Sequence, residues 1–419
     1  MIYLQQKIAA MNAGVHDEGD EIRLVRDLAA EVSAMAHSAD MAVIRRRWRD
    51  VNARRRPDRP PIWCNPVGCW PELLPESWLV CRHQELREIE RYCKRLLIKG
   101  AIGDDTPVLP TYDVAPVLTV TPANKWGFDI KAEKLSGAGT AWRYLPTVVT
   151  PDDYTRLRVP RYVFDAQATA ERRDRHQDYL GDSMPVRINP LGGYFSAATL
   201  CSEAAKLCGL EEMMMNMILT PELVHRLMSV MQQGVLNQIN TLEESPQLVA
   251  NTDGPMFLSD PLRDNDTGVV TLQDCWIHGN SQEFDPVSPA MFEEFLLNYQ
   301  RPIFARFGAV CYGCCENLTH KLDAVLTIPN LRLLTCSGWT DLGVLVEKAA
   351  SRCCIMWRHK ASDVVCPPDT SELRRKIRSQ ADLLGAASYQ VVLRELQTLM
   401  GHLDRLREWT LICQEELVR

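Results

Sequence analysis

Hydrophobic residues recur with a helical period near the amino end of the chain. The apolar positions that follow one helix face are Ile22, Leu24, Val25, Leu28, Ala29 and Val32. Ser38 stands where an N-cap would begin a second helix, so residues 20–56 predict two helices. We therefore expect residues 1–58 to form an N-terminal helical extension.

From residue 59 the pattern changes to short apolar runs that alternate with helical segments. Runs typical of strands lie at 61–64, 106–112, 186–189, 248–251, 269–276, 309–313, 332–336 and 353–357. Gly100 is expected to end a helix over 82–99, and Thr220-Pro221 and Ser288-Pro289 to begin helices. Such alternation predicts parallel strands with right-handed crossovers. Eight units predict an α/β protein, a (β/α)8 TIM barrel over residues 59–419; the alternative is an open doubly wound sheet.

Composition and charge fit a globular protein. Hydrophobic residues make up 46% and charged residues 24%, which excludes a mainly disordered, collagen-like or coiled-coil chain. Lys and Arg number 47 against 54 Asp and Glu, a net charge of −7, so no nucleic-acid partner is expected. Residues 253–294 hold nine acidic residues and a single basic one, Arg263, which predicts a solvated acidic face or a docking patch.

The fifteen cysteines are an odd number in a long chain without a convincing secretory signal. Reduced thiols and a cytoplasmic location fit this better than a disulfide framework does. No apolar run approaches the ~18 residues that cross a bilayer, so no membrane attachment is expected. A homodimer is among the assemblies that the sequence allows.

Candidate functional residues follow the predicted strands, because a barrel places its chemistry at the carboxyl ends of its strands. Residues assigned to substrate binding are Asn65, Trp70, Asn189, Asn251, Trp276, Trp339, Arg358, His359 and Lys360. Residues assigned to catalysis are His278, Glu283, Tyr312 and Glu316. Single members of this set also have purely structural interpretations. A histidine can lie at the surface, Glu283 can complement a helix dipole, and the tryptophans can pack in the core.

The most specific local pattern is CYGCCE, residues 311–316. Zinc takes thiolate, imidazole and carboxylate ligands, and a catalytic zinc keeps one position open. Cys314 and Cys315 are the predicted metal ligands, and buried thiols without a metal are the alternative. No paired CxxC motifs are present, so a structural zinc knuckle is not predicted.

The stretch from Asp274 to Leu342 resembles the uroporphyrinogen decarboxylase superfamily. It carries Q-E-F, S-P, E-E-F, Y-G-C-C-E, I-P-N-L-R and S-x-W-x-D in the order of an uncharacterised bacterial branch. The segments RPPIWCN, DDTPVLPTYDV at 104–114 and RLREW at 405–409 extend the resemblance over residues ~40 to 415. The resemblance implies a (β/α)8 barrel and one of two chemistries, porphyrinogen decarboxylation or zinc-assisted methyl transfer with a corrinoid protein.

Two departures from the family patterns bear on the choice. The decarboxylases carry an arginine-rich loop after the first strand, whereas this chain has CNPVGCWPELLPES without arginine, so the guanidinium anchors of a polycarboxylate are missing. The methyltransferases carry H-x-C after the sixth strand and a later cysteine. Here Tyr312-Gly313-Cys314 keeps the cysteine and replaces the histidine, and Cys366 lies in the later region.

The resemblance therefore implies a methyltransferase-like enzyme that demethylates a small O-, N- or S-methyl compound. The methyl would pass to a corrinoid on a separate protein, because no DxHxxG motif is present. If zinc binds, Cys314 is its expected ligand, with Cys315, Glu283, Glu316 or His278 completing the set. The alternatives are a metal-free decarboxylase or lyase of a small carboxylic acid, held by Arg358, His359 and Lys360, and a non-catalytic barrel subunit.

Overall fold

The computed structural model describes residues 8, 12, 14–134, 142–367 and 369–418. The α-helices are α2 (Glu18–Ala36), α3 (Ala39–Asn52), α4 (Trp70–Leu73), α5 (Gln84–Ile102), α6 (Pro151–Arg156), α7 (Ala166–Leu180), α8 (Leu200–Cys208), α9 (Leu210–Leu219), α10 (Pro221–Glu243), α11 (Pro289–Phe292), α12 (Asn298–Phe304), α13 (Leu322–Val325), α14 (Leu342–Ala349), α15 (Ala361–Val365), α16 (Ser371–Leu384) and α17 (Arg405–Glu416).

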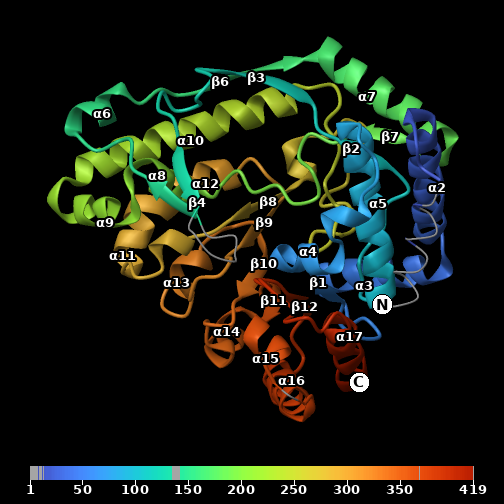
Figure 1. Cartoon of the computed structure of the whole chain (residues 1–419). Helices are drawn as coiled ribbons and strands as arrows, with labels where there is room; N and C mark the ends of the chain where they lie inside the picture. The colour runs from blue at the N-terminus through green and yellow to red at the C-terminus, as the bar shows by residue number, and fades with distance from the viewer. Residues whose placement is uncertain (1–7, 9–11, 13, 135–141, 368, 419) are drawn as a thin grey trace.

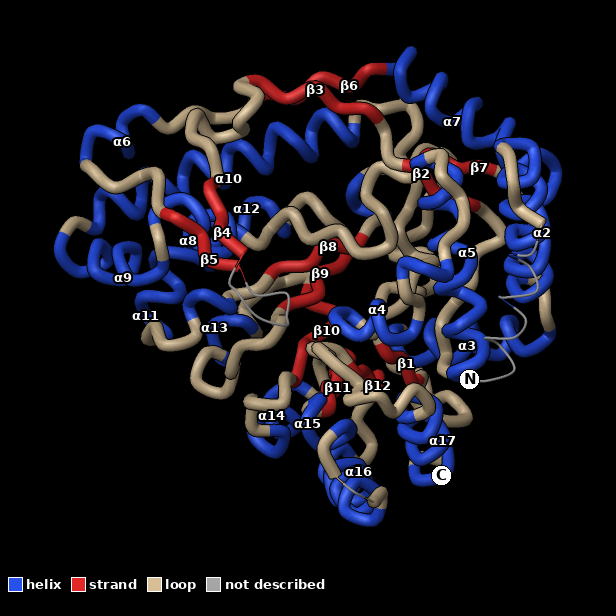
Figure 2. The backbone as a smooth tube through the Cα atoms, in the orientation of Figure 1, coloured by secondary structure: helices blue, strands red, loops and turns tan. Residues whose placement is uncertain are grey.

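The strands are β1 (Ile62–Cys64), β2 (Tyr112–Val114), β3 (Val117–Thr121), β4 (Lys131–Lys134), β5 (Trp142–Leu145), β6 (Arg161–Asp165), β7 (Val186–Ile188), β8 (Trp276–Gly279), β9 (Ala309–Tyr312), β10 (Leu331–Cys336), β11 (Cys354–His359) and β12 (Tyr389–Leu393). Six of them form a central parallel sheet in the order β1-β12-β11-β10-β9-β8. A separate parallel pair joins β2 to β7, and antiparallel pairs join β3 to β6 and β4 to β5. Figures 1 and 2 show the central strands with helices around them, α14–α17 below and α2, α3 and α5 to the right. The predicted α/β class with parallel strands is confirmed.

Among the described residues, the backbone hydrogen bonds between strands do not close this sheet into a barrel. At its β1 edge, the carboxylates of Asp105 and Asp104 accept the backbone N–H groups of Ile62 and Cys64, both at 2.8 Å. At the β8 edge, the Asn251 side chain forms hydrogen bonds with both the backbone N–H and the backbone carbonyl of Trp276. Side chains thus occupy positions that a neighbouring strand would take, which is why the expected ring of eight paired strands is not formed by backbone ladders.

Three of the predicted strand positions are wrong. Residues 248–251 form no strand, and of 269–276 only Trp276 belongs to one, because the preceding turn at Leu272–Asp274 is a 3-10 helix. The run at 106–112 reaches a strand only at Tyr112, since Pro107 and Pro110 lack the N–H that a ladder needs. Strand β12 was not predicted at all, although it joins β1 to β11.

The predicted helices are found with small shifts of their ends. Ser38 caps α3 by accepting the Met41 backbone N–H at 3.2 Å. Gly100 lies inside α5, which ends instead before Gly103, a residue with φ of 80°. Pro221 and Pro289 begin α10 and α11 as expected, and Ser288 caps α11. No described helix is long and apolar enough to pass through a lipid bilayer.

Side chains alternate along the central strands between two cores. Cys311, Leu333 and Met356 point to one side of the sheet and join the cluster around Trp276 and Trp48. Tyr312, Leu334, Ile355 and Trp357 point to the other side and pack against the surrounding helices. This alternation decides which residues at the strand ends share a site.

Candidate functional site

Two neighbouring thiols lie just beyond the carboxyl end of β9. Cys314 and Cys315 have their Sγ atoms 3.5 Å apart, and Cys315 Sγ is 3.3 Å from Glu395 Oε1. The turn depends on Gly313, whose φ is 100° and where a Cβ would lie 2.8 Å from Leu318. Both thiols are half-buried, whereas most of the other cysteines are buried.

A buried guanidinium lies against these thiols. Arg358, at the end of β11, donates through Nη1 to the carbonyl of Cys314 and to Glu395 Oε1, both at 2.9 Å. The same Nη1 is 3.8 Å from Cys314 Sγ. The Arg358 side chain is fully buried, and its Nη2 has no hydrogen-bond partner among the described residues. The cluster therefore holds a fixed positive charge with one unused donor group.

This arrangement makes Cys314 the acidic member of the thiol pair. The contact with Cys315 Sγ, in which either sulfur can be the donor, and the charge of Arg358 outweigh burial and lower the pKa of Cys314 to about 6. The same contact, together with burial, raises the pKa of Cys315. Burial opposes the charge of Arg358, but its neighbours Cys314, Tyr194 and Glu395 raise its pKa. The site thus favours ionisation of Cys314 over that of Cys315, next to the Arg358 guanidinium.

Aromatic groups form a second wall of the site. The Tyr194 ring lies 4.7 Å from the His278 ring and 4.9 Å from Phe257, and the Arg394 guanidinium lies 5.6 Å from the Tyr194 centroid. His278 Nε2 is 3.1 Å from the carbonyl of Gly313, which only accepts, so Nε2 carries the proton. Burial lowers the pKa of His278 to about 3 and raises that of Tyr194, so both stay uncharged. The Tyr194 hydroxyl and His278 Nδ1 are buried without described partners.

Glu316 holds the turn that carries Cys314 and Cys315 through two backbone hydrogen bonds. Its Oε1 accepts the backbone N–H of Ser281 at 2.7 Å, and its Oε2 accepts that of Cys314 at 2.8 Å. The carboxylate therefore fixes the position of Cys314 relative to the loop after β8. In this structure its two oxygens are engaged by backbone donors, which leaves the proposed acid role of Glu316 without a free oxygen.

Two other catalytic candidates lie away from the thiols. The Tyr312 side chain points to the helix side of the sheet, where its hydroxyl donates to Gln300 Oε1 at 3.1 Å. Glu283 accepts from the Ser202 hydroxyl at 2.8 Å, and its Oε2 has no described partner. The strand period explains Tyr312, because its neighbour Cys311 faces the opposite core.

The substrate-binding candidates separate into several places. Asn65 and Trp70 line a cavity of about 490 Å³ beside β1 and α5. Asn189 donates to Asp113 Oδ2 at 2.7 Å, beside the ion pair of Arg187 with Asp113. Trp276 is fully buried and donates to Ser259, so it packs below the thiols as core.

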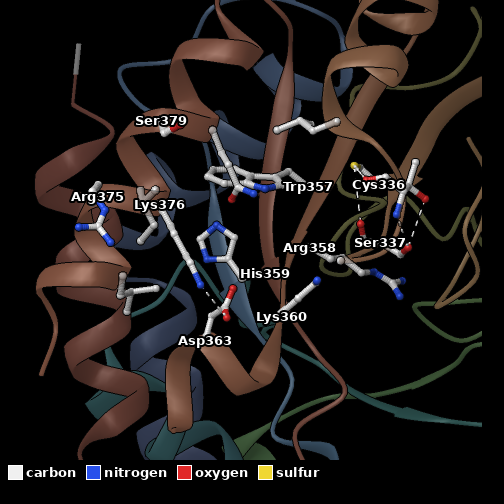
Figure 3. Close-up of a pocket in the computed structure, with 16 residues that line it drawn as sticks. Cys336, Ser337, Trp357, Arg358, His359, Lys360, Asp363, Arg375, Lys376 and Ser379 are labelled. Carbon is white, nitrogen blue, oxygen red and sulfur yellow. Dashed lines mark hydrogen bonds and ion pairs between the residues drawn. The ribbon is translucent and has the colours of Figure 1, made fainter. Parts of the chain in front are cut away.

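Of the three consecutive residues Arg358, His359 and Lys360, the first turns its guanidinium to Cys314 and Glu395, away from the other two. His359 faces the helix side, where Trp409 Nε1 donates to its Nδ1 at 2.9 Å. The Lys360 ammonium lies 4.5 Å from the centroid of the exposed Trp339 ring. Figure 3 shows Arg358 leaving the strand away from His359 and Lys376.

Asn251 is a buried link between a loop and β8. Its Nδ2 donates to the Trp276 carbonyl at 3.0 Å, and its Oδ1 accepts the Trp276 N–H at 2.8 Å. We expect Asn251→Ala to lower the free energy of unfolding by about 2 kcal/mol, because two buried backbone groups lose their partner. Urea unfolding measures this, with exposed Asn298→Ala as the control. Unchanged stability with a raised KM would instead make Asn251 a substrate ligand.

Three residues of the cluster were missed by sequence reasoning. Arg394 and Glu395 follow β12, and reading the residues after YQVVL as a strand end would have found them. Tyr194 follows Gly192-Gly193, which lie four residues beyond β7. No spacing signal connects Tyr194 to Cys314, since the two are brought together only by the packing of distant loops.

The donors at the thiols do not form the set that zinc takes. Cys314, Cys315 and Glu395 lie close together, but the Arg358 cation already contacts Cys314 and Glu395. Among the described residues, no group of three or more His, Cys, Asp or Glu side chains is placed to hold a metal ion. A zinc ion at Cys314 stays a prediction.

Comparison with known proteins identifies the fold. No protein-family profile matches the chain. No curated protein sequence matches it either. Among solved structures, a methyltransferase from Methanosarcina mazei is similar over 89% of this chain and 98% of its own, with a TM-score of 0.50 and 12% sequence identity. The chain therefore shares its overall fold with a methyltransferase.

Proposed function

We propose that this chain is a methyltransferase-like enzyme in which the Cys314 thiolate takes the methyl group from a small O-, N- or S-methyl compound. The observation that carries the proposal is the thiol of lowered pKa, held between Cys315 and the buried Arg358. A thiolate is a strong nucleophile toward a methyl carbon, and its fixed counter-charge keeps it ionised at neutral pH. The fold shared with a methyltransferase supports the same reaction class.

The chemical step is a displacement at carbon. A lone pair of Cys314 Sγ forms a bond to the methyl carbon, and the bond from that carbon to the substrate heteroatom breaks. The heteroatom leaves with the bonding electron pair. Arg358 Nη2 and the Tyr194 hydroxyl are two buried donors without described partners in the same cluster of residues. The Tyr194 hydroxyl would give its proton to the departing heteroatom, which leaves as a neutral molecule, and would regain a proton from water.

The proposed acceptor of the methyl group is a corrinoid on a separate protein. The resemblance of residues 274–342 to the uroporphyrinogen decarboxylase superfamily supports this partner, and the same resemblance supports a (β/α)8 barrel. When bound, such a corrinoid would supply the nucleophile for a second displacement, in which the bond from the methyl carbon to Cys314 Sγ breaks and the thiolate is restored. The residues of this chain would hold the substrate and keep Cys314 ionised.

A mass measurement tests the proposal. The protein is incubated with a panel of methyl compounds (methanol, trimethylamine, dimethyl sulfide and 4-methoxybenzoate), and the tryptic peptide containing Cys314 is analysed. We expect one compound to add the mass of one methylene group to Cys314, and we expect no methylation of that peptide in Cys314→Ser. Elemental analysis runs alongside. One zinc per chain that is lost in Cys314→Ser, without any methylated cysteine, would overturn the thiolate mechanism in favour of a zinc site.

The pH dependence of thiol alkylation follows from the pKa of Cys314. Iodoacetamide reacts with the thiolate, so its rate is expected to fall as the pH drops through about 6. Above that pH the rate should be level, in contrast to an ordinary thiol, which titrates at about pH 8.5. Labelling of the Cys314 peptide followed by mass spectrometry measures the profile. The exposed Cys366 in the same sample provides the comparison, and coincident profiles would contradict the proposed ion pair.

The second candidate function is decarboxylation of a small acid. The observation that favours it is the unused Nη2 of Arg358, which can bind a carboxylate next to Arg394 and Tyr194. In that case Cys314→Ser would retain turnover of the acid, whereas methyl transfer requires the thiol. Carbon dioxide release by the Cys314→Ser variant distinguishes the two reactions.

A further inference from the structure

A second cavity lies on the helix side of β10 and β11, away from the thiols. It has a volume of about 490 Å³ and is bounded by the loop after β10, by β11 and α15, and by one face of α16. Figure 3 shows His359 near its centre, with Lys376 and Asp363 beside it. Cavities of this size hold small molecules. Neither Cys314 nor Cys315 lines it.

The cavity contains a buried hydrogen-bond donor without an acceptor. The Trp409 indole N–H can only donate, so His359 Nδ1, at 2.9 Å, must accept. Burial lowers the pKa of His359 to about 3, so the ring is neutral and its single proton is on Nε2. His359 is 5% exposed, and Nε2 has no partner among the described residues. In native proteins such a buried N–H is paired with an acceptor, which an ordered water or an atom of a bound molecule can supply.

The cavity is lined by both apolar and polar side chains, and its rim is basic. Trp357, Leu373 and Ile377 are buried and form the apolar part. Lys360 and Arg375 are exposed at the rim and form no ion pair with a described carboxylate, whereas Lys376 is paired with Asp363 at 3.0 Å and with Glu372 at 3.2 Å. The unneutralised rim charge is therefore positive. This combination suits an organic anion with a flat apolar body.

We propose that this cavity binds a small aromatic carboxylate that carries an acceptor oxygen on its ring. The ring lies against Trp357, the ring oxygen accepts the proton of His359 Nε2, and the carboxylate lies at the rim near Lys360 and Arg375. The site is separate from the proposed methyl transfer and does not depend on it, because Arg358 turns its guanidinium to Cys314 and Glu395.

Titration calorimetry with 4-hydroxybenzoate tests the site in the full-length protein. We expect binding that weakens about fivefold to tenfold in Lys360→Met/Arg375→Met, since two exposed charge contacts are removed. Lys348→Met is the matched control, because it removes an exposed lysine that pairs with Asp323 on another face. The uncharged 4-hydroxybenzamide should bind the native protein about fivefold to tenfold more weakly than 4-hydroxybenzoate does. Cys314→Ser should bind as the native protein does, which separates this site from the thiols.

A spectroscopic measurement reports on the buried donor itself. In protein labelled with ¹⁵N-histidine, the Nε2–H signal assigned by its absence in His359→Phe should shift on addition of 4-hydroxybenzoate. Benzoate, which lacks the ring oxygen, should leave that signal in place. No heat with 4-hydroxybenzoate, equal binding by the double variant, or an unmoved Nε2–H signal would each overturn the proposal.

Discussion

Replacing Cys314 by serine is expected to reduce methyl transfer by a factor on the order of 10³ or more, with little change in stability. The physical reason is that a serine hydroxyl is not ionised at neutral pH, whereas the Cys314 thiolate is held by Cys315 and Arg358. The side chain is half-buried and nearly the same size, so the fold should tolerate the change. Single-turnover assays with the methyl donor found in the mass-spectrometry panel measure the loss.

Two control variants sharpen this result. Cys366→Ser alters an exposed thiol at the end of α15 and should leave the rate unchanged. Cys315→Ser keeps a hydrogen-bond donor beside Cys314, and a hydroxyl donates more strongly than a thiol. We therefore expect Cys314 to keep its lowered pKa and the rate to fall far less than in Cys314→Ser. If Cys314→Ser transfers methyl groups at the native rate, the thiolate has no part in the reaction.

Replacing Arg358 by methionine is expected to have the second large effect. The change removes the cation beside Cys314 Sγ and leaves Glu395 without its partner. We expect the pKa of Cys314 to rise from about 6 toward the ordinary value of about 8.5, so the thiolate is lost at neutral pH. Because the guanidinium is fully buried, the free energy of unfolding should also fall by about 3 kcal/mol.

The pH profile of Cys314 alkylation and urea unfolding measure these two effects separately. Arg358→Lys keeps the positive charge but lacks the planar guanidinium. Cys314 should therefore keep part of its lowered pKa in this variant, whereas in Arg358→Met it should not. Glu395→Gln serves as a second variant that keeps Arg358 in place and removes the opposing carboxylate, and it should leave Cys314 ionised. An alkylation profile that is the same in Arg358→Met and the native protein would show that Arg358 does not stabilise the thiolate.

The local patterns of the chain were enough to predict most of its secondary structure. The apolar period of residues 22–32 and the cap at Ser38 describe two helices, because helix ends and amphipathic faces are set by nearby residues. The runs at 309–313, 332–336 and 353–357 correspond to β9, β10 and β11, since strands buried on both faces are apolar throughout. Parallel strands and the position of Cys314 at a strand end followed from the same patterns.

The order of apolar and polar residues thus predicts the fold class and the place of the CYGCCE turn, whereas the residues that meet at this turn are known only from the folded chain. Tyr312 is adjacent to the thiols in sequence but faces the helices, because successive side chains of a strand point to opposite sides. Arg358 lies 44 residues from Cys314 and Glu395 lies 80 residues from Cys315, yet each contacts that thiol, because the parallel strands of one sheet end at the same edge. The lowered pKa of Cys314 depends on those distances, burial and charges, and they exist only once the strands have paired.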